Sequence, residues 1–153
     1  MASDEGIQIL LVEDNASDAE LALHALKKSK LVNSVVHLED GEAALDFLFC
    51  RATYADRRFE SPPCLVLLDL NLPKRDGLQV LRELKSDLRT KSIPVILLTS
   101  SKEERDMVTG YHLGVNSYIQ KPVNFSEFQD VVRQLGLYWL QVNSKPPAAA
   151  FSI

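Results

Sequence analysis

Short apolar segments recur along the chain, separated by stretches in which apolar residues follow a helical spacing. Three of the segments are nearly continuous in Ile, Leu and Val, which is typical of strands covered on both faces of a parallel sheet. The other two are shorter and more mixed in composition. We therefore predict five strands, at residues 7–12, 35–38, 64–68, 94–98 and 117–120.

Between these strands, apolar residues stand three and four positions apart, as in amphipathic helices. The first helix is expected to begin with a capping box at Ser17-Asp18-Ala19-Glu20, in which side chains bond the first free backbone amides. Gly114 is expected to end the fourth helix, because glycine readily adopts the left-handed backbone of a helix C-terminus. The other helices are predicted at 41–50, at 78–85 and from 126 towards 142, and the fourth at 103–113.

A strand followed by a helix, five times over, predicts an α/β fold with right-handed crossovers. We expect a single-domain (βα)5 flavodoxin-like fold with a parallel five-stranded sheet in the order 2-1-3-4-5, because a chain of 153 residues suits one such domain. The predicted organisation is an N-terminal tail at 1–6, the domain at 7–142 with a polar loop inserted at 51–63, and a C-terminal tail at 143–153.

Polar residues follow the carboxyl ends of four predicted strands. Glu13 and Asp14 follow the first strand, Asp69 the third, Thr99 the fourth and Lys121 the fifth. In an open α/β sheet these ends line the crevice where ligands bind. A single strand-terminal Asp is commonly a turn former or a helix cap. Acidic residues at two neighbouring strand ends are harder to explain in that way, because they repel each other unless a cation lies between them.

A hard divalent ion such as Mg²⁺ binds carboxylates and water, so it suits this edge. Lys121 offers a further positive charge and Thr99 a hydroxyl donor. Together these groups form a place for a dianionic phosphoryl group, and Asp69 supplies the oxygen that accepts it. We therefore predict a Mg²⁺-dependent phosphoryl site.

These motifs together resemble the receiver domain of two-component response regulators, over about residues 7–140. "LLVEDN" resembles the acidic pair of that family and "LVLLDLNLPKRDG" its phosphoacceptor segment. "VILLTSS" fits the Thr/Ser position, and "SYIQKP" fits the aromatic and Lys-Pro positions. The segment 51–63, with "LLDLNLPKRDG", further resembles the response regulators that work with bacterial and cyanobacterial phytochrome kinases.

The resemblance implies that a histidine kinase, of phytochrome type, transfers a phosphoryl group from a phosphohistidine to Asp69. It also implies that Asp14, Asp69 and the backbone carbonyl of Asn71 bind Mg²⁺ directly, and that Glu13 acts through water. The protein would then be a phosphoacceptor that assists its own phosphorylation and dephosphorylation, and not an enzyme acting on a separate substrate.

The same resemblance implies a conformational switch. Lys121 pairs with Asp69 at rest and with a phosphoryl oxygen afterwards, and Thr99 donates a hydrogen bond to the new group. Tyr118 then turns inward, which alters the surface of the fourth helix and fifth strand. The Lys121-Pro122 bond corresponds to a position that is cis in this family.

Other functions remain open on the residues alone. A receiver could serve a kinase that is not a photoreceptor. A haloacid-dehalogenase-like phosphatase also uses a strand-end Asp with Mg²⁺. That family carries a "DxD" motif after its first strand, whereas here the Asp follows the third strand and position 71 is Asn. A nucleotide-binding module would need a Gly-rich loop where "EDN" stands. A pseudo-receiver that only binds partners would not need Asp14, Asp69, Thr99 and Lys121 together.

Charge and composition limit the kinds of partner and the cellular location that we expect. The net charge is −4 and no basic block occurs, so nucleic-acid binding is not expected. No apolar run approaches the roughly 20 residues of a membrane span, and "MASDEG" is not the basic start of a signal peptide. Two cysteines without a CxxC pattern suit a reducing cytoplasm.

The end of the sequence suggests how the signal leaves the protein. No output domain is expected after residue 142, so signalling would use a downstream protein or a phosphotransfer partner. The last predicted helix leaves Leu137 and Leu140 off its sheet-facing side, beside Tyr138 and Trp139. Either the tail "PPAAAF" folds back over these residues or a second copy of the chain covers them. We expect the second, a homodimer through this helix and the neighbouring fifth strand.

Overall fold

The computed structural model describes residues 8–28, 34–99, 109, 111–115, 117–120, 126 and 130. Within this part of the chain, strands and helices alternate as predicted. The strands are β1 (Gln8–Val12), β2 (Ser34–Leu38), β3 (Leu65–Asp69), β4 (Val95–Thr99) and β5 (Ser117–Gln120). The helices are α1 (Ala16–Lys28), α2 (Gly41–Leu48) and α3 (Gly77–Ser86), with a short 3₁₀ helix η1 (Ala52–Tyr54).

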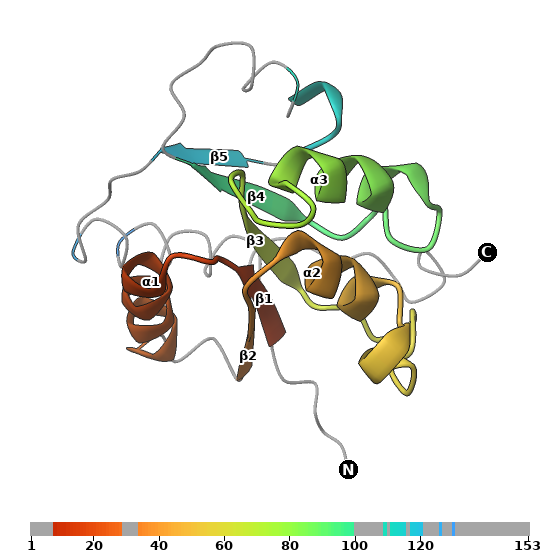
Figure 1. Cartoon of the computed structure of the whole chain (residues 1–153), viewed down its shortest axis with the longest axis horizontal. Coiled ribbons are helices and arrows are strands. Elements are labelled where there is room, and N and C mark those ends of the chain that lie inside the picture. The colour runs from red at the N-terminus through yellow and green to blue at the C-terminus, as the bar shows by residue number, and fades with distance from the viewer. Residues whose placement is uncertain are drawn as a thin grey trace.

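The sheet is parallel and has the strand order β2-β1-β3-β4-β5, which confirms the predicted fold (Figure 1). Val12, the last residue of β1, lies opposite Leu38 on one side and Leu68 on the other. Asp69 lies opposite Leu98 of β4. The carboxyl ends of the central strands are therefore level, so the residues that follow them meet at one edge.

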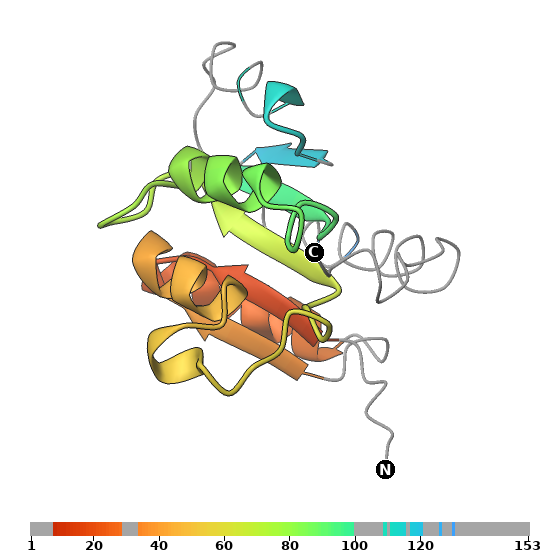
Figure 2. The ribbon, with the colours of Figure 1, turned by 90° about the vertical axis from the view of Figure 1, so that its right-hand side faces the viewer.

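Two apolar clusters cover the two faces of the sheet. Successive strand residues point to opposite faces, so Leu10 and Val12 belong to one cluster and Ile9 and Leu11 to the other. The first cluster includes buried residues of α2 and α3, and the second includes Ala22, Ala25 and Leu26 of α1. Figures 1 and 2 show α2 and α3 side by side on one face and α1 on the opposite face. The site at the sheet edge thus stands on a core packed from both sides.

The start of α1 differs from the prediction. The helix begins at Ala16, and the side-chain oxygen of Asn15 accepts a hydrogen bond from the Asp18 amide at 2.9 Å. The predicted capping box that starts at Ser17 is therefore wrong, because Asn15 caps the helix two residues earlier. Asparagine is as good a cap as serine, so the helix can start directly after the acidic pair.

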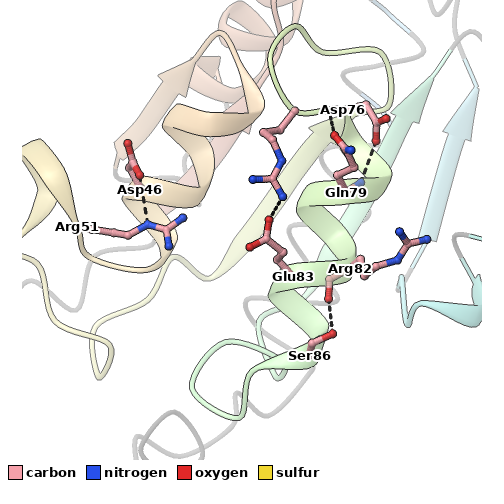
Figure 3. A network of polar contacts seen from close by, with 8 residues as sticks. Asp46, Arg51, Asp76, Gln79, Arg82, Glu83 and Ser86 are labelled. Atoms are coloured by element: carbon pink, nitrogen blue, oxygen red, sulfur yellow. Dashed lines mark hydrogen bonds and ion pairs between the residues drawn. The ribbon is translucent and has the colours of Figure 1, made fainter.

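The other two α-helices in the described residues, α2 and α3, begin at acidic caps. Asp40 accepts a hydrogen bond from the Ala43 amide at 2.7 Å at the start of α2. A reciprocal capping box joins Asp76 and Gln79 at the start of α3, with bonds of 2.9 and 3.0 Å (Figure 3). These caps fix where both helices enter at the carboxyl edge of the sheet.

The inserted segment 51–63 is a packed structure at the opposite, amino edge of the sheet. The guanidinium of Arg57 lies 3.7 Å from the centre of the Phe47 ring and donates to the Phe47 carbonyl and, at 3.2 Å, to that of Ser61. The Arg89 guanidinium lies 4.2 Å from the centre of the Phe59 ring. The insertion is thereby joined both to α2 and to the loop before β4.

The remaining predicted elements fall largely outside the described residues. Gly114 has a φ of +98° and its amide bonds the Tyr111 carbonyl at 3.1 Å, so the predicted helix end at this glycine is confirmed. The rest of the fourth helix, the last helix apart from residues 126 and 130, which are helical, and Lys121 and Pro122 lie outside the described residues. Among the described residues, no helix has the length and apolar character needed to cross a membrane.

Candidate metal and phosphoryl site

Asp69 is the last residue of β3 and is 4% exposed. The main chain around it is held by the sheet, since the Leu70 amide bonds the Leu98 carbonyl at 3.1 Å. Its carboxylate accepts a hydrogen bond from the Asn71 amide at 3.3 Å. The strand therefore fixes both the position and the orientation of this carboxylate.

Glu13 and Asp14 follow β1 directly. Glu13 is 1% exposed, and its amide bonds the Leu38 carbonyl at 3.0 Å, which extends the β1–β2 pairing by one residue. Its carboxylate accepts a hydrogen bond from the Asn15 amide at 3.2 Å. Asp14 is exposed. The pair therefore presents one buried and one solvent-facing carboxylate.

The three acidic residues form one cluster. One carboxylate oxygen from each of Glu13, Asp14 and Asp69 lies within 4.8 Å of the other two. Two of these groups are buried, and neighbouring buried carboxylates are unfavourable without positive charge. An all-oxygen donor set with one exposed member suits a hard divalent cation that keeps some of its water. The residues present therefore fit such an ion.

The loop between β3 and α3 closes tightly over the end of β3. The Gly77 amide bonds the Leu70 carbonyl at 2.8 Å, and a Cβ at position 77 would lie 2.3 Å from the Asp69 carbonyl oxygen. Any side chain there would push the loop away, so the turn requires glycine. Lys74 holds a left-handed backbone with φ +67°. The loop thereby keeps Asn71 beside the Asp69 carboxylate.

The other predicted site residues lie on or beyond the neighbouring strands. Thr99 ends β4 and is paired with Gln120, and Tyr118 is paired with Leu97, as seen from the backbone. Lys121 follows β5 and lies outside the described residues. The structure thus brings Glu13, Asp14, Asp69 and Asn71 together, with Thr99 at the next strand end. The roles of all these residues stay predictions.

Sequence reasoning missed one residue that contacts the acidic segment. His37 of β2 lies with its Nε2 atom 2.9 Å from the carbonyl oxygen of Glu13. The second strand was not expected to contribute to the site, because it is the outermost strand of the sheet, away from the predicted crevice. The available signal was His37 itself, a histidine near the end of the strand that pairs with β1, which precedes the acidic pair.

The family of the chain follows from comparison with known proteins. Residues 9–133 match the model of the response regulator receiver domain, and the chain belongs to this family. Receiver domains bind a divalent metal, in agreement with the acidic cluster.

Two regulatory proteins are similar to this chain over nearly its whole length. The chain is 41% identical to the response regulator Rcp1 of Synechocystis sp., over 92% of this chain and 93% of the relative. It is 39% identical to the probable methanogenesis regulatory protein FilR2 of Methanothrix harundinacea, over 97% of this chain and 94% of the relative.

Two solved structures resemble this structure closely. The phosphorylated cyanobacterial phytochrome response regulator RcpA superposes with a TM-score of 0.84 at 42% identity, covering 92% of this chain and 99% of that chain. The Mn²⁺-bound form of Rcp1 superposes with a TM-score of 0.81 at 39% identity, with the same coverage. The chain is therefore a receiver-domain response regulator homologous to phytochrome response regulators.

Proposed function

We propose that this protein is a stand-alone response regulator that accepts a phosphoryl group on Asp69 from the phosphohistidine of a histidine kinase. The observation that carries the proposal is the cluster of Glu13, Asp14 and Asp69 at the carboxyl edge of the sheet. The stand-alone arrangement is supported by Rcp1, FilR2 and RcpA, because the chain spans 93 to 99% of the length of each.

In this proposal an Asp69 carboxylate oxygen attacks the phosphorus in line, forming the P–O bond as the bond to the kinase histidine breaks. Asp14, Asp69 and the Asn71 carbonyl would hold Mg²⁺, and Glu13 would act through water. The ion, when bound, offsets the negative charge on the transferring oxygens. The protein itself contributes mainly position, since the β3 ladder and the Asn71 amide hold the Asp69 carboxylate in one orientation.

The response to phosphorylation would pass through β4 and β5. Phosphorylation adds negative charge and acceptor oxygens at Asp69. Lys121 and Thr99 would bond these oxygens, and Tyr118 would turn inward to fill the space behind Thr99. The adjacent pairing of β3, β4 and β5 supports this route, because the three strand ends are neighbours in the sheet.

The proposed kinase is a phytochrome-type light-sensing kinase. RcpA is described as a cyanobacterial phytochrome response regulator, and this chain resembles it over nearly its whole length. The similarity to FilR2, a probable methanogenesis regulatory protein, favours a second candidate, a kinase that is not a photoreceptor. Phosphotransfer from a purified phytochrome kinase, compared between red and far-red light, separates the two candidates.

The proposal also includes where the protein acts and with what. A cytoplasmic location is supported by the two free thiols, Cys50 and Cys64. We further propose a homodimer, through the last helix and fifth strand, and a downstream protein or phosphotransfer partner. Sedimentation at micromolar concentration, with and without phosphorylation, tests the dimer, and a Leu140→Glu variant tests its surface.

Incubation with acetyl phosphate and Mg²⁺ tests the central proposal. Intact mass should increase by one phosphoryl group in the wild type and in an Asp87→Asn control, and should not increase in Asp69→Asn. Full labelling of Asp69→Asn would overturn the assignment. Hydrolysis of a generic phosphate ester with repeated turnover would instead favour a phosphatase.

A further inference from the structure

The junction between β2 and α2, residues 37–41, contacts both segments that carry the acidic cluster. It supplies no carboxylate to that cluster. On one side it bonds the segment of Glu13, and on the other it bonds the loop that follows Asn71. We refer to these five residues as the β2–α2 junction.

The contact with the first segment uses both backbone groups of Glu13. The Leu38 carbonyl accepts from the Glu13 amide at 3.0 Å, and the Nε2 atom of His37 lies 2.9 Å from the Glu13 carbonyl oxygen. A carbonyl oxygen can only accept, so the imidazole donates its Nε2–H in this bond. Two consecutive residues of β2 therefore hold the peptide groups on either side of the Glu13 side chain.

The contact with the loop is a close approach of two backbones. The Gly41 amide lies 3.4 Å from the Pro73 carbonyl oxygen, and a Cβ on Gly41 would lie 1.8 Å from the Arg75 carbonyl oxygen. This space exists only because position 41 is glycine. The Asp40 carboxylate also pairs with the Lys74 ammonium at 3.6 Å. The loop is thereby held against the start of α2.

These contacts oppose the repulsion within the cluster. Carboxylates within 4.8 Å of one another push the first segment and the loop apart when no cation lies between them. The β2–α2 junction is fixed in the sheet and at a helix start, and it holds both segments at one separation. A site held in this way loses less entropy when it binds an ion.

We propose that the β2–α2 junction positions the divalent-metal site, with His37 and Gly41 as its positioning residues. This inference rests on the proposed metal and phosphoryl site. His37 acts by holding the main chain of Glu13, and Gly41 acts by letting the loop approach α2. Neither residue touches the reacting groups.

The experiment is a titration with Mn²⁺, followed by electron paramagnetic resonance of the free ion at one fixed pH. His37→Leu should weaken Mn²⁺ binding by about 10-fold or more, the usual effect of losing a partner behind a metal ligand. His37→Gln should restore most of the affinity, because the glutamine Nε2–H can reach the same carbonyl. The control variant His24→Leu changes an exposed histidine on α1, and it should bind Mn²⁺ as tightly as the wild type does.

A second pair of variants separates positioning from loss of stability. Gly41→Ala and Gly114→Ala should both lower the unfolding midpoint, because one creates a backbone clash and the other places alanine at φ +98°. Only Gly41→Ala should also weaken Mn²⁺ binding. If Gly41→Ala does not fold, the comparison of His37→Leu with His37→Gln still decides.

Phosphorylation by acetyl phosphate provides a further readout. At saturating Mn²⁺, His37→Leu should be labelled at close to the wild-type rate, because its defect is in holding the metal. Equal Mn²⁺ affinity in wild type and folded His37→Leu would overturn this inference alone. Absence of Mn²⁺ binding to the wild type would overturn the proposed metal site, and this inference with it.

Discussion

At the carboxyl edge of the sheet, Glu13, Asp14 and Asp69 lie within 4.8 Å of one another. At the amino edge two partly buried cations, Arg57 and Lys85, rest on protein acceptors. Arg57 bonds two carbonyl groups and covers the Phe47 ring, and the Lys85 ammonium donates to the Lys91 and Ile93 carbonyls at 2.9 and 2.7 Å. One edge concentrates like charges, and the other distributes charges among acceptors.

The comparison indicates which charges serve folding and which serve binding. A cation with carbonyl and aromatic partners stabilises the fold without any added ligand. Crowded carboxylates reduce stability unless positive charge is brought to them. Removing a charge should therefore have opposite effects on stability at the two edges. Four measurements, one of the phosphorylation rate and three of stability, test the comparison.

The largest effect is expected for metal-dependent phosphorylation in Asp14→Ala. The labelling rate with acetyl phosphate and Mg²⁺ should fall at least ~100-fold, because a bound metal ion contributes several kcal/mol to phosphoryl transfer. Circular dichroism should show an intact fold, since Asp14 is exposed. Asp46→Ala removes a carboxylate of α2 that pairs with Arg51, and this variant should keep the wild-type rate. An unchanged rate in Asp14→Ala would move the metal site elsewhere.

Removal of the Arg57 guanidinium should give the next largest effect. Arg57→Met should lower the free energy of unfolding by about 2 kcal/mol, because contact with the Phe47 ring and two hydrogen bonds are lost. Urea denaturation measures the change, and Arg58→Met, at an exposed neighbouring position, should stay within about 0.5 kcal/mol of the wild type. The phosphorylation rate should be unaffected. Equal losses in both variants would contradict the assigned role.

At the carboxyl edge the sign should reverse. Without metal, Asp69→Asn should raise the free energy of unfolding by about 1 kcal/mol, because relief of the repulsion among three crowded carboxylates should outweigh the loss of the proposed pairing with Lys121. Urea denaturation in the presence of a chelator measures the difference. The same isosteric change in Asp87→Asn should not stabilise, since Asp87 is hydrogen bonded to Arg89, which lowers its pKa. A destabilised Asp69→Asn would break the comparison between the edges.

The smallest effect concerns Lys85. Burial lowers its pKa from 10.5 to about 8. Between these values the unfolded chain binds a proton that the folded chain does not, so this group makes stability rise with pH from about 8 towards 10.5. The two carbonyl acceptors favour the charged amine and oppose the effect of burial, so stability should change with pH less than a pKa of about 8 alone would give.

The test for Lys85 compares the wild type with Lys85→Met. The stability of the wild type relative to the variant should increase between about pH 7.5, just below the folded pKa, and about pH 9.5, where the unfolded chain still holds the proton. Urea denaturation at both pH values measures it. A relative stability that stays level or falls over this interval would show that the amine is held charged by its two carbonyl acceptors.

Much of the fold and the acidic cluster could be predicted because short-range patterns determine them. The apolar run that ends at Asp69 defines a buried strand, and parallel pairing brings its end level with that of β1. The boundaries of α1 could not be predicted as well, since Asn15 and Ser17 are equivalent caps and the loop geometry selects between them.

Contacts between residues that are far apart along the chain could not be predicted from the sequence. Arg57 lies in a polar segment that was predicted to be a loop, and nothing local indicates that its guanidinium packs on Phe47. His37 was missed because its bond to Glu13 joins residues 24 positions apart. Such contacts follow from packing of the whole domain, which spacing along the chain does not encode.

The location of the insertion has a consequence for how such proteins diversify. Arg57 and Phe59 hold this segment at the amino edge, and the length of the strands and of α2 separates it from the carboxyl edge where the acidic residues lie. Changes in its outward-facing positions can therefore accumulate without altering the chemistry. A library randomised at the exposed residues Thr53, Ala55 and Glu60 offers protein engineers a surface for new recognition on an unchanged phosphoacceptor.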